Sequence, residues 1–196
     1  MNETGVEKQF VERMRELLVS LPYDLKVLFE AMSDEDLSVE TRQLAVRTVI
    51  YCLSLSDPIP GTLGLIGFVD DVVTTRIALT KMQEIGGEAM GEYPQRFPEQ
   101  FDPLKSDVEL IGAYLGNTVD WVHWRLDKMS GVKYKGKSVA DYLDDEEAGQ
   151  RLYEEGLAFT TDYEIDDDAA AKLLSGKPVL EAFRRVYEVE RSRQES

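Results

Sequence analysis

Apolar residues recur every three or four positions along most of the chain, a spacing typical of helices that bury one face. The first such stretch covers about residues 6–21 and is predicted to end near Pro22, because proline lacks the backbone N–H that a helix interior needs. A short second helix is predicted over 25–32. A third is predicted over 39–55, with Ser38 as its N-cap.

Proline and glycine interrupt the helical pattern in the middle of the chain. Residues 57–61 hold two prolines and a glycine and therefore predict a turn. A helix is predicted to resume near residues 67–68 and to end at the two glycines at 86–87. Residues 88–105 carry three prolines and three aromatic residues at four-residue spacing. We expect an ordered connector there, because the rings need a surface to pack on.

The pattern of a capping box, Ser106 to Glu109, predicts the start of the longest helix, over 107–130. Its apolar stripe includes aromatic residues, so we expect it to be the central helix. Strand signals are poor throughout.

Three more helices are predicted beyond this point, over about 144–159, over 166–174 with Asp166 as N-cap, and from Pro178 to about 191. The end of the last helix is basic, which complements its dipole. The sequence thus predicts an all-α fold, a compact bundle of seven or eight helices in one domain over 1–196.

Charge restricts the classes of partner. The chain has 38 acidic and 22 basic residues, a net charge of −16. A field of that sign repels phosphate, so we expect no nucleic-acid partner and little affinity for anionic bilayers. The N-terminus has no signal-peptide pattern, and the longest apolar run, Leu63–Val69, is too short to cross a membrane. With one cysteine, Cys52, in an apolar run, we expect a cytoplasmic protein.

The least polar stretch, Tyr51–Leu79, contains three aspartates, Asp57, Asp70 and Asp71. Carboxylates are costly to bury without partners, so these three need an explanation. One reading is a divalent cation site for magnesium or calcium, since such cations take several carboxylate oxygens. The other reading is structural: Asp57 caps the turn, and Asp70 and Asp71 lie in the first turn of a helix, where the dipole favours negative charge.

This stretch resembles the YkvA-like family, a domain of unknown function whose signature aligns without a gap on residues 51–71. The residues that carry the resemblance are Tyr51, Ser54, Asp57, Ile59, Pro60, Gly67, Phe68, Asp70 and Asp71. The chain departs from the signature where Leu55, Gly61 and Gly64 replace a proline, an acid and a second proline. The resemblance implies a helical hairpin, here the kernel of the fold over 39–85, and a membrane-associated or bacterial cytoplasmic context. It implies no established reaction.

A second polar set is predicted on one face of the 107–130 helix. Gly112, Gly116, Asp120, His123 and Asp127 follow one another at three- or four-residue spacing. The last three are candidate metal ligands, although the Glu-x-x-His pairs of helical di-metal proteins are absent. The alternative is a helix contact that gives way to a solvated end.

No pattern of an enzyme nucleophile, phosphate-binding loop, C-x-x-C or EF-hand is present. The segment 139–168 is strongly acidic and opens an acidic C-terminal helical subregion over 139–196. The leading hypothesis is therefore a non-enzymatic interaction or scaffold module of the bacterial cytoplasm, with an acidic docking surface at 139–168 for a basic protein partner. The alternatives are a metal-binding protein or metal-dependent enzyme that uses Asp57, Asp70 and Asp71, and a peripheral membrane protein that uses Leu63–Val69. A homo-oligomer is left open.

Overall fold

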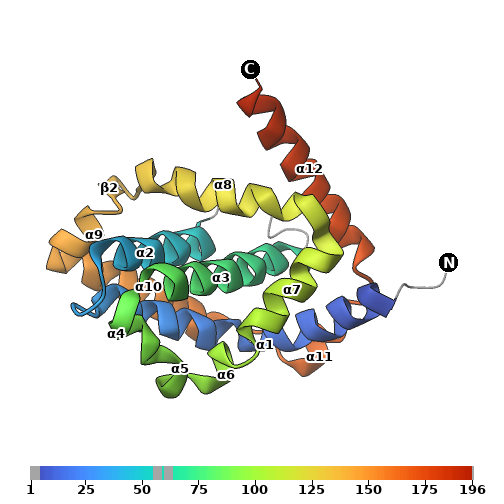
Figure 1. Cartoon of the computed structure of the whole chain (residues 1–196), viewed down its shortest axis with the longest axis horizontal. Coiled ribbons are helices and arrows are strands. Elements are labelled where there is room, and N and C mark those ends of the chain that lie inside the picture. The colour runs from blue at the N-terminus through green and yellow to red at the C-terminus, as the bar shows by residue number, and fades with distance from the viewer. Residues whose placement is uncertain (1–4, 55–58, 60–63, 196) are drawn as a thin grey trace.

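Helices make up almost all of the computed structural model, which describes residues 5–54, 59 and 64–195 (Figure 1). The structure is 81% helix and 2% strand, so the predicted all-α class is confirmed, and the number of helices is close to the prediction. The longer helices are α1 (Gly5–Ser33), α2 (Val39–Leu53), α3 (Ile66–Ile85), α7 (Leu104–Leu115), α8 (Asp120–Lys128), α10 (Glu146–Asp162) and α12 (Lys177–Gln194). The shorter elements are α4 (Gly87–Gly91), α5 (Tyr93–Arg96), α6 (Pro98–Phe101), α9 (Asp141–Asp144), α11 (Asp167–Ala170), two 3-10 turns (Gly116–Val119 and Met129–Gly131), and the strands β1 (Lys133–Tyr134) and β2 (Lys137–Ser138).

Helix α3 lies at the centre of the molecule (Figure 1). It contacts α1, α2, α7, α8 and α12, and most of its residues are buried on every side. A helix that is apolar all round is typical of such a position. The prediction that 107–130 forms the central helix is therefore wrong. Helices α2 and α3, which the predicted hairpin kernel covers, pack against each other and against α1.

Helix α1 runs without interruption through Pro22, so the predicted break there is wrong. A proline inside a helix leaves the carbonyl four residues earlier without its usual donor. That carbonyl belongs to Leu18, and the hydroxyl of Tyr163 donates to it over 2.7 Å. The C-terminal half of the chain thus supplies the hydrogen bond that Pro22 removes, and the helix continues.

The stretch 107–130 is divided, against the prediction of one long helix. Gly116 ends α7 with φ +59°, in the left-handed region that favours glycine, and a 3-10 turn leads into α8. The capping box does not form either: α7 begins at Leu104, and the hydroxyl of Ser106 donates to the Pro103 carbonyl over 2.8 Å. The predicted polar face from Gly112 to Asp127 is therefore not continuous.

Several predictions made from short-range sequence patterns are confirmed elsewhere in the chain. The hydroxyl of Ser38 accepts from Thr41 N–H at 3.2 Å, and the carboxylate of Asp166 accepts from Ala169 N–H at 2.8 Å, so both predicted caps are confirmed. Pro178 lies in the first turn of α12, as predicted. Helix α11, however, ends at Ala170 rather than at 174, and a short antiparallel hairpin forms where no strand is predicted.

The connector over 88–105 is ordered, as predicted. It folds into the short helices α4, α5 and α6. Tyr93 is fully buried, and its ring lies 5.7 Å from that of Phe97 and 6.4 Å from that of Phe101, measured between centroids. The connector thereby returns the chain to α3 and positions the start of α7.

We expect Tyr163→Phe to lower the free energy of unfolding by about 1–2 kcal/mol, because it leaves the buried Leu18 carbonyl without a donor. In a Pro22→Ala background the new backbone N–H can donate to that carbonyl, so the same substitution should cost less. Chemical denaturation of the four proteins in this cycle measures the coupling. An equal cost of Tyr163→Phe in both backgrounds would contradict the assignment.

Candidate functional site

The core contains a positively charged group, the guanidinium of Arg76 on α3. The residue is 1% exposed. Its Nη2 lies 3.2 Å from a carboxylate oxygen of Asp24 on α1, and its Nε lies 3.7 Å from Asp107 on α7. Its Nη1 donates to the Gln100 carbonyl over 2.7 Å. One side chain therefore ties α3 to α1, α6 and α7.

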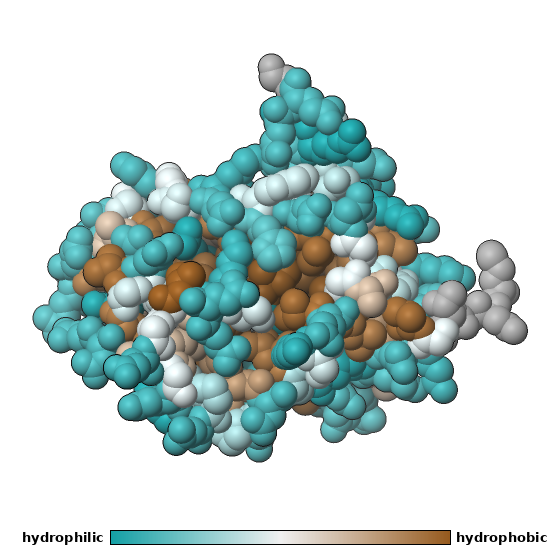
Figure 2. All heavy atoms as spheres, viewed as in Figure 1, coloured by the Kyte–Doolittle hydropathy of each residue, from teal (hydrophilic) through white to brown (hydrophobic). Residues whose placement is uncertain are grey.

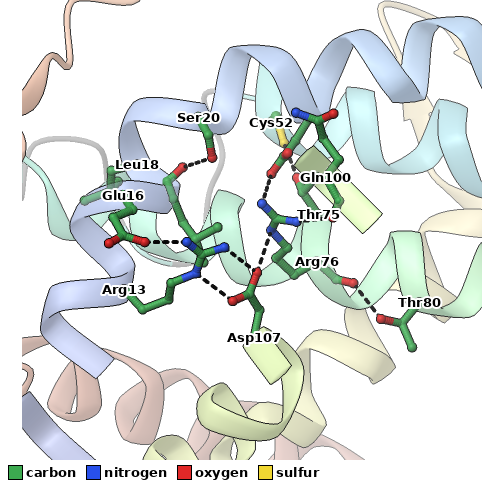
Figure 3. Close-up of polar contacts among 12 residues, drawn as sticks. Arg13, Glu16, Leu18, Ser20, Cys52, Thr75, Arg76, Thr80, Gln100 and Asp107 are labelled. Atoms are coloured by element: carbon green, nitrogen blue, oxygen red, sulfur yellow. Dashed lines mark hydrogen bonds and ion pairs between the residues drawn. The ribbon is translucent and has the colours of Figure 1, made fainter. Parts of the chain in front are cut away.

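Asp107 is shared between two arginines. Arg13, on α1, donates to both of its carboxylate oxygens, from Nε at 2.6 Å and from Nη2 at 3.0 Å. Figure 3 shows Arg13 and Arg76 converging on this one carboxylate, with Glu16 on the far side of Arg13. The bidentate contact is the strong geometry for an arginine–carboxylate pair. We call Arg13, Asp24, Arg76 and Asp107 the core ion network.

Asp24 is the least satisfied member of the core ion network. It is fully buried, and within the described residues neither of its carboxylate oxygens accepts a hydrogen bond. Burial raises the pKa of Asp24 to about 7, against the opposing attraction of Arg76. The carboxyl group therefore changes its charge near neutral pH.

Sequence reasoning missed the core ion network. Its signal was present, since Arg76 stands in an apolar stretch and Asp24 stands between Leu21 and Leu25. What the sequence does not reveal is the pairing, because Asp24 and Arg76 lie far apart in the chain. Asp107 was assigned to a capping box instead.

The aspartates of the apolar stretch do not cap the helix. Helix α3 begins at Ile66, which places Asp70 and Asp71 in its second turn, and both are buried, at 0% and 2% exposed. The structural reading that assigns them to the first turn is wrong. Asp70 accepts a hydrogen bond from the Tyr51 hydroxyl at 2.6 Å, which joins α2 to α3.

Asp71 lies near the hydroxyl of Tyr163. The pKa of Tyr163 is raised well above its usual value, mainly by burial and further by the charges of Asp71 and Cys52. Of the other signature residues, Ser54 ends α2 and Gly67 is buried near the start of α3. Asp57 and Pro60 lie outside the described residues.

The second metal candidate is a row on α8. The Asp127 carboxylate accepts from Lys81 at 3.2 Å. The pKa of His123 is lowered by burial and by Lys81, while Asp120 and Asp127 oppose the shift. Across residues 5–54, 59 and 64–195, no group of three or more His, Cys, Asp or Glu is arranged to hold a metal ion. A divalent-cation site that includes Asp57 stays a prediction.

An acidic cleft lies where α1 ends. Its volume is about 590 Å³, and we call it the α1 cleft. Its lining contains five acidic residues and one basic residue: Glu30, Ser33, Asp34, Asp36, Glu88, Ala89, Glu92 and Arg96. The last turn of α1 has no basic residue, so the negative end of its dipole adds to the field of the carboxylates.

Some of the carboxylates in the α1 cleft already have partners. Arg96 donates to Glu30 at 2.9 Å, and the Tyr93 hydroxyl donates to Asp34 at 2.8 Å. Glu88 and Glu92 are exposed one helical turn apart, and neither forms an ion pair with another described residue. These two acids are open to a positively charged group from outside.

A second cleft, of about 520 Å³, adjoins the first at Ser33. It runs between α1, α2, α9 and α10, where Tyr142 and Tyr153 form part of its wall beside the acids Glu35, Asp144 and Glu146. The acidic segment 139–168 thus contributes to the surface, but in part only. Other acids of that segment pair within the chain, such as Asp145 with Lys137 at 2.6 Å.

Comparison with known proteins finds no relative: no family model matches the chain, and no curated protein or solved structure matches it. The resemblance to the YkvA-like family stays a prediction. In the described part of the chain, no helix is long and apolar enough to cross a membrane.

We expect Arg76→Met to lower the free energy of unfolding by about 3–5 kcal/mol, because it leaves the buried Asp24 carboxyl without its counter-ion. Arg96→Met removes an exposed pair instead and should cost less than about 1 kcal/mol. Urea denaturation of both variants measures the difference. Equal costs would show that the core ion network is not a structural anchor.

We expect Asp24 to make the protein less stable as the pH rises. A carboxyl whose pKa is raised on folding binds its proton more tightly in the folded state, so its contribution to stability is lost between about pH 4 and pH 7 and levels off above. Asp24→Asn should remove this slope. Denaturation of both proteins across that pH range provides the test, and parallel profiles would contradict it.

Proposed function

We propose that the protein is a non-enzymatic interaction module whose α1 cleft receives a basic segment of a partner protein. The observation that carries this proposal is the lining of the cleft, in which five carboxylates face one arginine. A cationic side chain placed there meets opposite charge on several sides, and the helix dipole acts in the same direction.

The shape of the surface supports a peptide-like ligand over a compact ion. The α1 cleft shares Ser33 with the second cleft, whose wall includes the 39% exposed side chain of Tyr153. Acidic side chains next to aromatic ones suit arginine, which pairs with carboxylates and also stacks on rings. The proposed partner is therefore an arginine-containing segment. Carboxylates bind its arginines in the first cleft, and stacking on an aromatic ring binds them in the second.

The membrane alternative has less support. Of the apolar run Leu63–Val69, the residues from Leu65 onward are buried or half-buried, and Phe68 packs its ring 5.4 Å from that of Tyr163. Such a surface offers little apolar area to a bilayer. We place the protein in the bacterial cytoplasm as part of the same proposal, on its charge and its resemblance to the YkvA-like family.

The test uses a fluorescent peptide of alternating arginine and serine and follows its anisotropy at low salt. We expect wild type to bind it, and Glu88→Gln/Glu92→Gln to bind it about five- to thirtyfold more weakly, since each exposed carboxylate contributes about 0.5–1 kcal/mol. Raising the salt concentration should weaken binding by wild type.

The matched control is Glu12→Gln/Glu109→Gln, which removes the same charge from exposed positions on α1 and α7. It should bind the peptide nearly as wild type does. If the two double variants lose the same affinity, the peptide responds to net charge alone, and the α1 cleft is not the site.

A further inference from the structure

The last helix, α12, is positively charged in a strongly acidic protein. Over Lys177–Gln194 it carries five basic and three acidic residues, a net charge of +2, whereas the whole chain carries −16. The basic residues are Lys177, Arg184, Arg185, Arg191 and Arg193. Arg184 and Arg185 lie at its middle, and Arg191 and Arg193 lie near its end.

The second half of α12 projects from the body of the molecule (Figure 1). The first half is anchored, with Val179 and Phe183 fully buried and the Phe183 ring 5.5 Å from that of Trp121. The last contacts with the body are the stacking of Tyr187 on Trp124, at 5.4 Å, and the ion pair of Glu190 with Lys128. Figure 2 shows the remainder as a hydrophilic arm that stands clear of the surface.

We define the arm as residues 184–194, which begin directly after the anchored Phe183 and include the projecting second half of α12. Arg184 and Arg185 are exposed, and neither forms an ion pair within the described residues. Val189 follows Arg185 by one turn, is 46% exposed, and is followed by Arg193 at the same spacing. Val186 and Tyr187 hold one side of the arm against the body, and the exposed residues leave its other side open to a partner.

We propose that the arm of one copy of this chain docks in the α1 cleft of a second copy. The inference rests on the proposed function, because it uses the same cleft and names its occupant. The arm supplies Arg184 and Arg185, and the cleft supplies the carboxylates of Glu88 and Glu92. None of these four residues forms an ion pair within the described residues, whereas Arg191 and Arg193 pair with glutamates of their own helix end. About 16 Å of helix is available for this contact.

An arm cannot reach the α1 cleft of its own molecule. The ribbon places α4 and the end of α1 at one side of the body, and the free end of α12 projects from the opposite side (Figure 1). The contact is therefore between molecules and joins two different surfaces. Repeated head to tail, such a contact builds a ring or an open chain of copies.

Charge selects a second copy over a nucleic acid. DNA brings a long run of phosphates towards a body of charge −16, which repels it at every approach of the arm. Two copies also repel each other at long range, but the arm holds its arginines away from the body. At contact, the short-range attraction between arm and cleft decides the outcome, so association should weaken as salt rises.

Sedimentation velocity over a concentration series at low salt tests the proposal. Wild type should form assemblies larger than a monomer. The arm variant Arg184→Glu/Arg185→Glu and the cleft variant Glu88→Arg/Glu92→Arg should each associate at least tenfold more weakly. An equimolar mixture should recover association, because the basic arm of the cleft variant fits the acidic cleft of the arm variant.

The matched control for the arm variant, Lys8→Glu/Lys26→Glu, also replaces two basic residues with glutamate, at exposed positions on α1, and should associate like wild type. The proposal is overturned if wild type remains a monomer throughout, if either variant associates like wild type, or if the mixture does not recover. A monomer that still binds the arginine–serine peptide would overturn arm docking and leave the proposed function standing. A monomer whose arm retards duplex DNA would assign the arm to nucleic acid instead.

Discussion

A guanidinium group in a protein core needs carboxylates within reach, and this requirement determines how the helices around Arg76 are arranged. Its counter-ions come from α1 and α7, and the Gln100 carbonyl from α6 is its third partner. Transfer of such a charge from water costs several kcal/mol unless partners surround it. Helices α1, α6 and α7 must therefore all meet α3 at one point. The short helices of the connector return the chain from the end of α3 to that point.

The second constraint concerns α1, which is long and carries a proline in its interior. The C-terminal half of the chain satisfies groups along its length: Tyr163 donates to the Leu18 carbonyl, and Arg15 donates to the Leu173 carbonyl at 2.6 and 2.9 Å. Ser175 donates to Glu7 near the start of the helix. The C-terminal segment thus belongs to the same structure as the helical kernel, although the family resemblance does not extend to it.

The structural features that the sequence predicts correctly depend on neighbours in the chain. The caps at Ser38 and Asp166, the proline that opens α12 and the ordered aromatic connector are all decided within a few residues. The incorrect predictions depend on distant partners. Tyr163 lies far from Pro22 in the sequence, yet it supplies the donor to the Leu18 carbonyl that the proline removes. The acids of the α1 cleft come from 30–36 and 88–92, so the surface they share is visible only after folding. Gly116 is a different case, because a glycine in a helical pattern gives little sign of whether it will adopt positive φ.

The charges of this protein fall into two populations with opposite roles. In the core, Arg76, Asp107 and Arg13 pair with one another and so join the helices that carry them. At the surface, the acids of the α1 cleft lie on one side of the bundle, and the arginines of the arm lie on the other side. This separation stabilises neither surface by itself. In the proposed assembly a second molecule brings the two surfaces together, and opposite charges then meet, which is the reason to assign both surfaces to binding in that proposal.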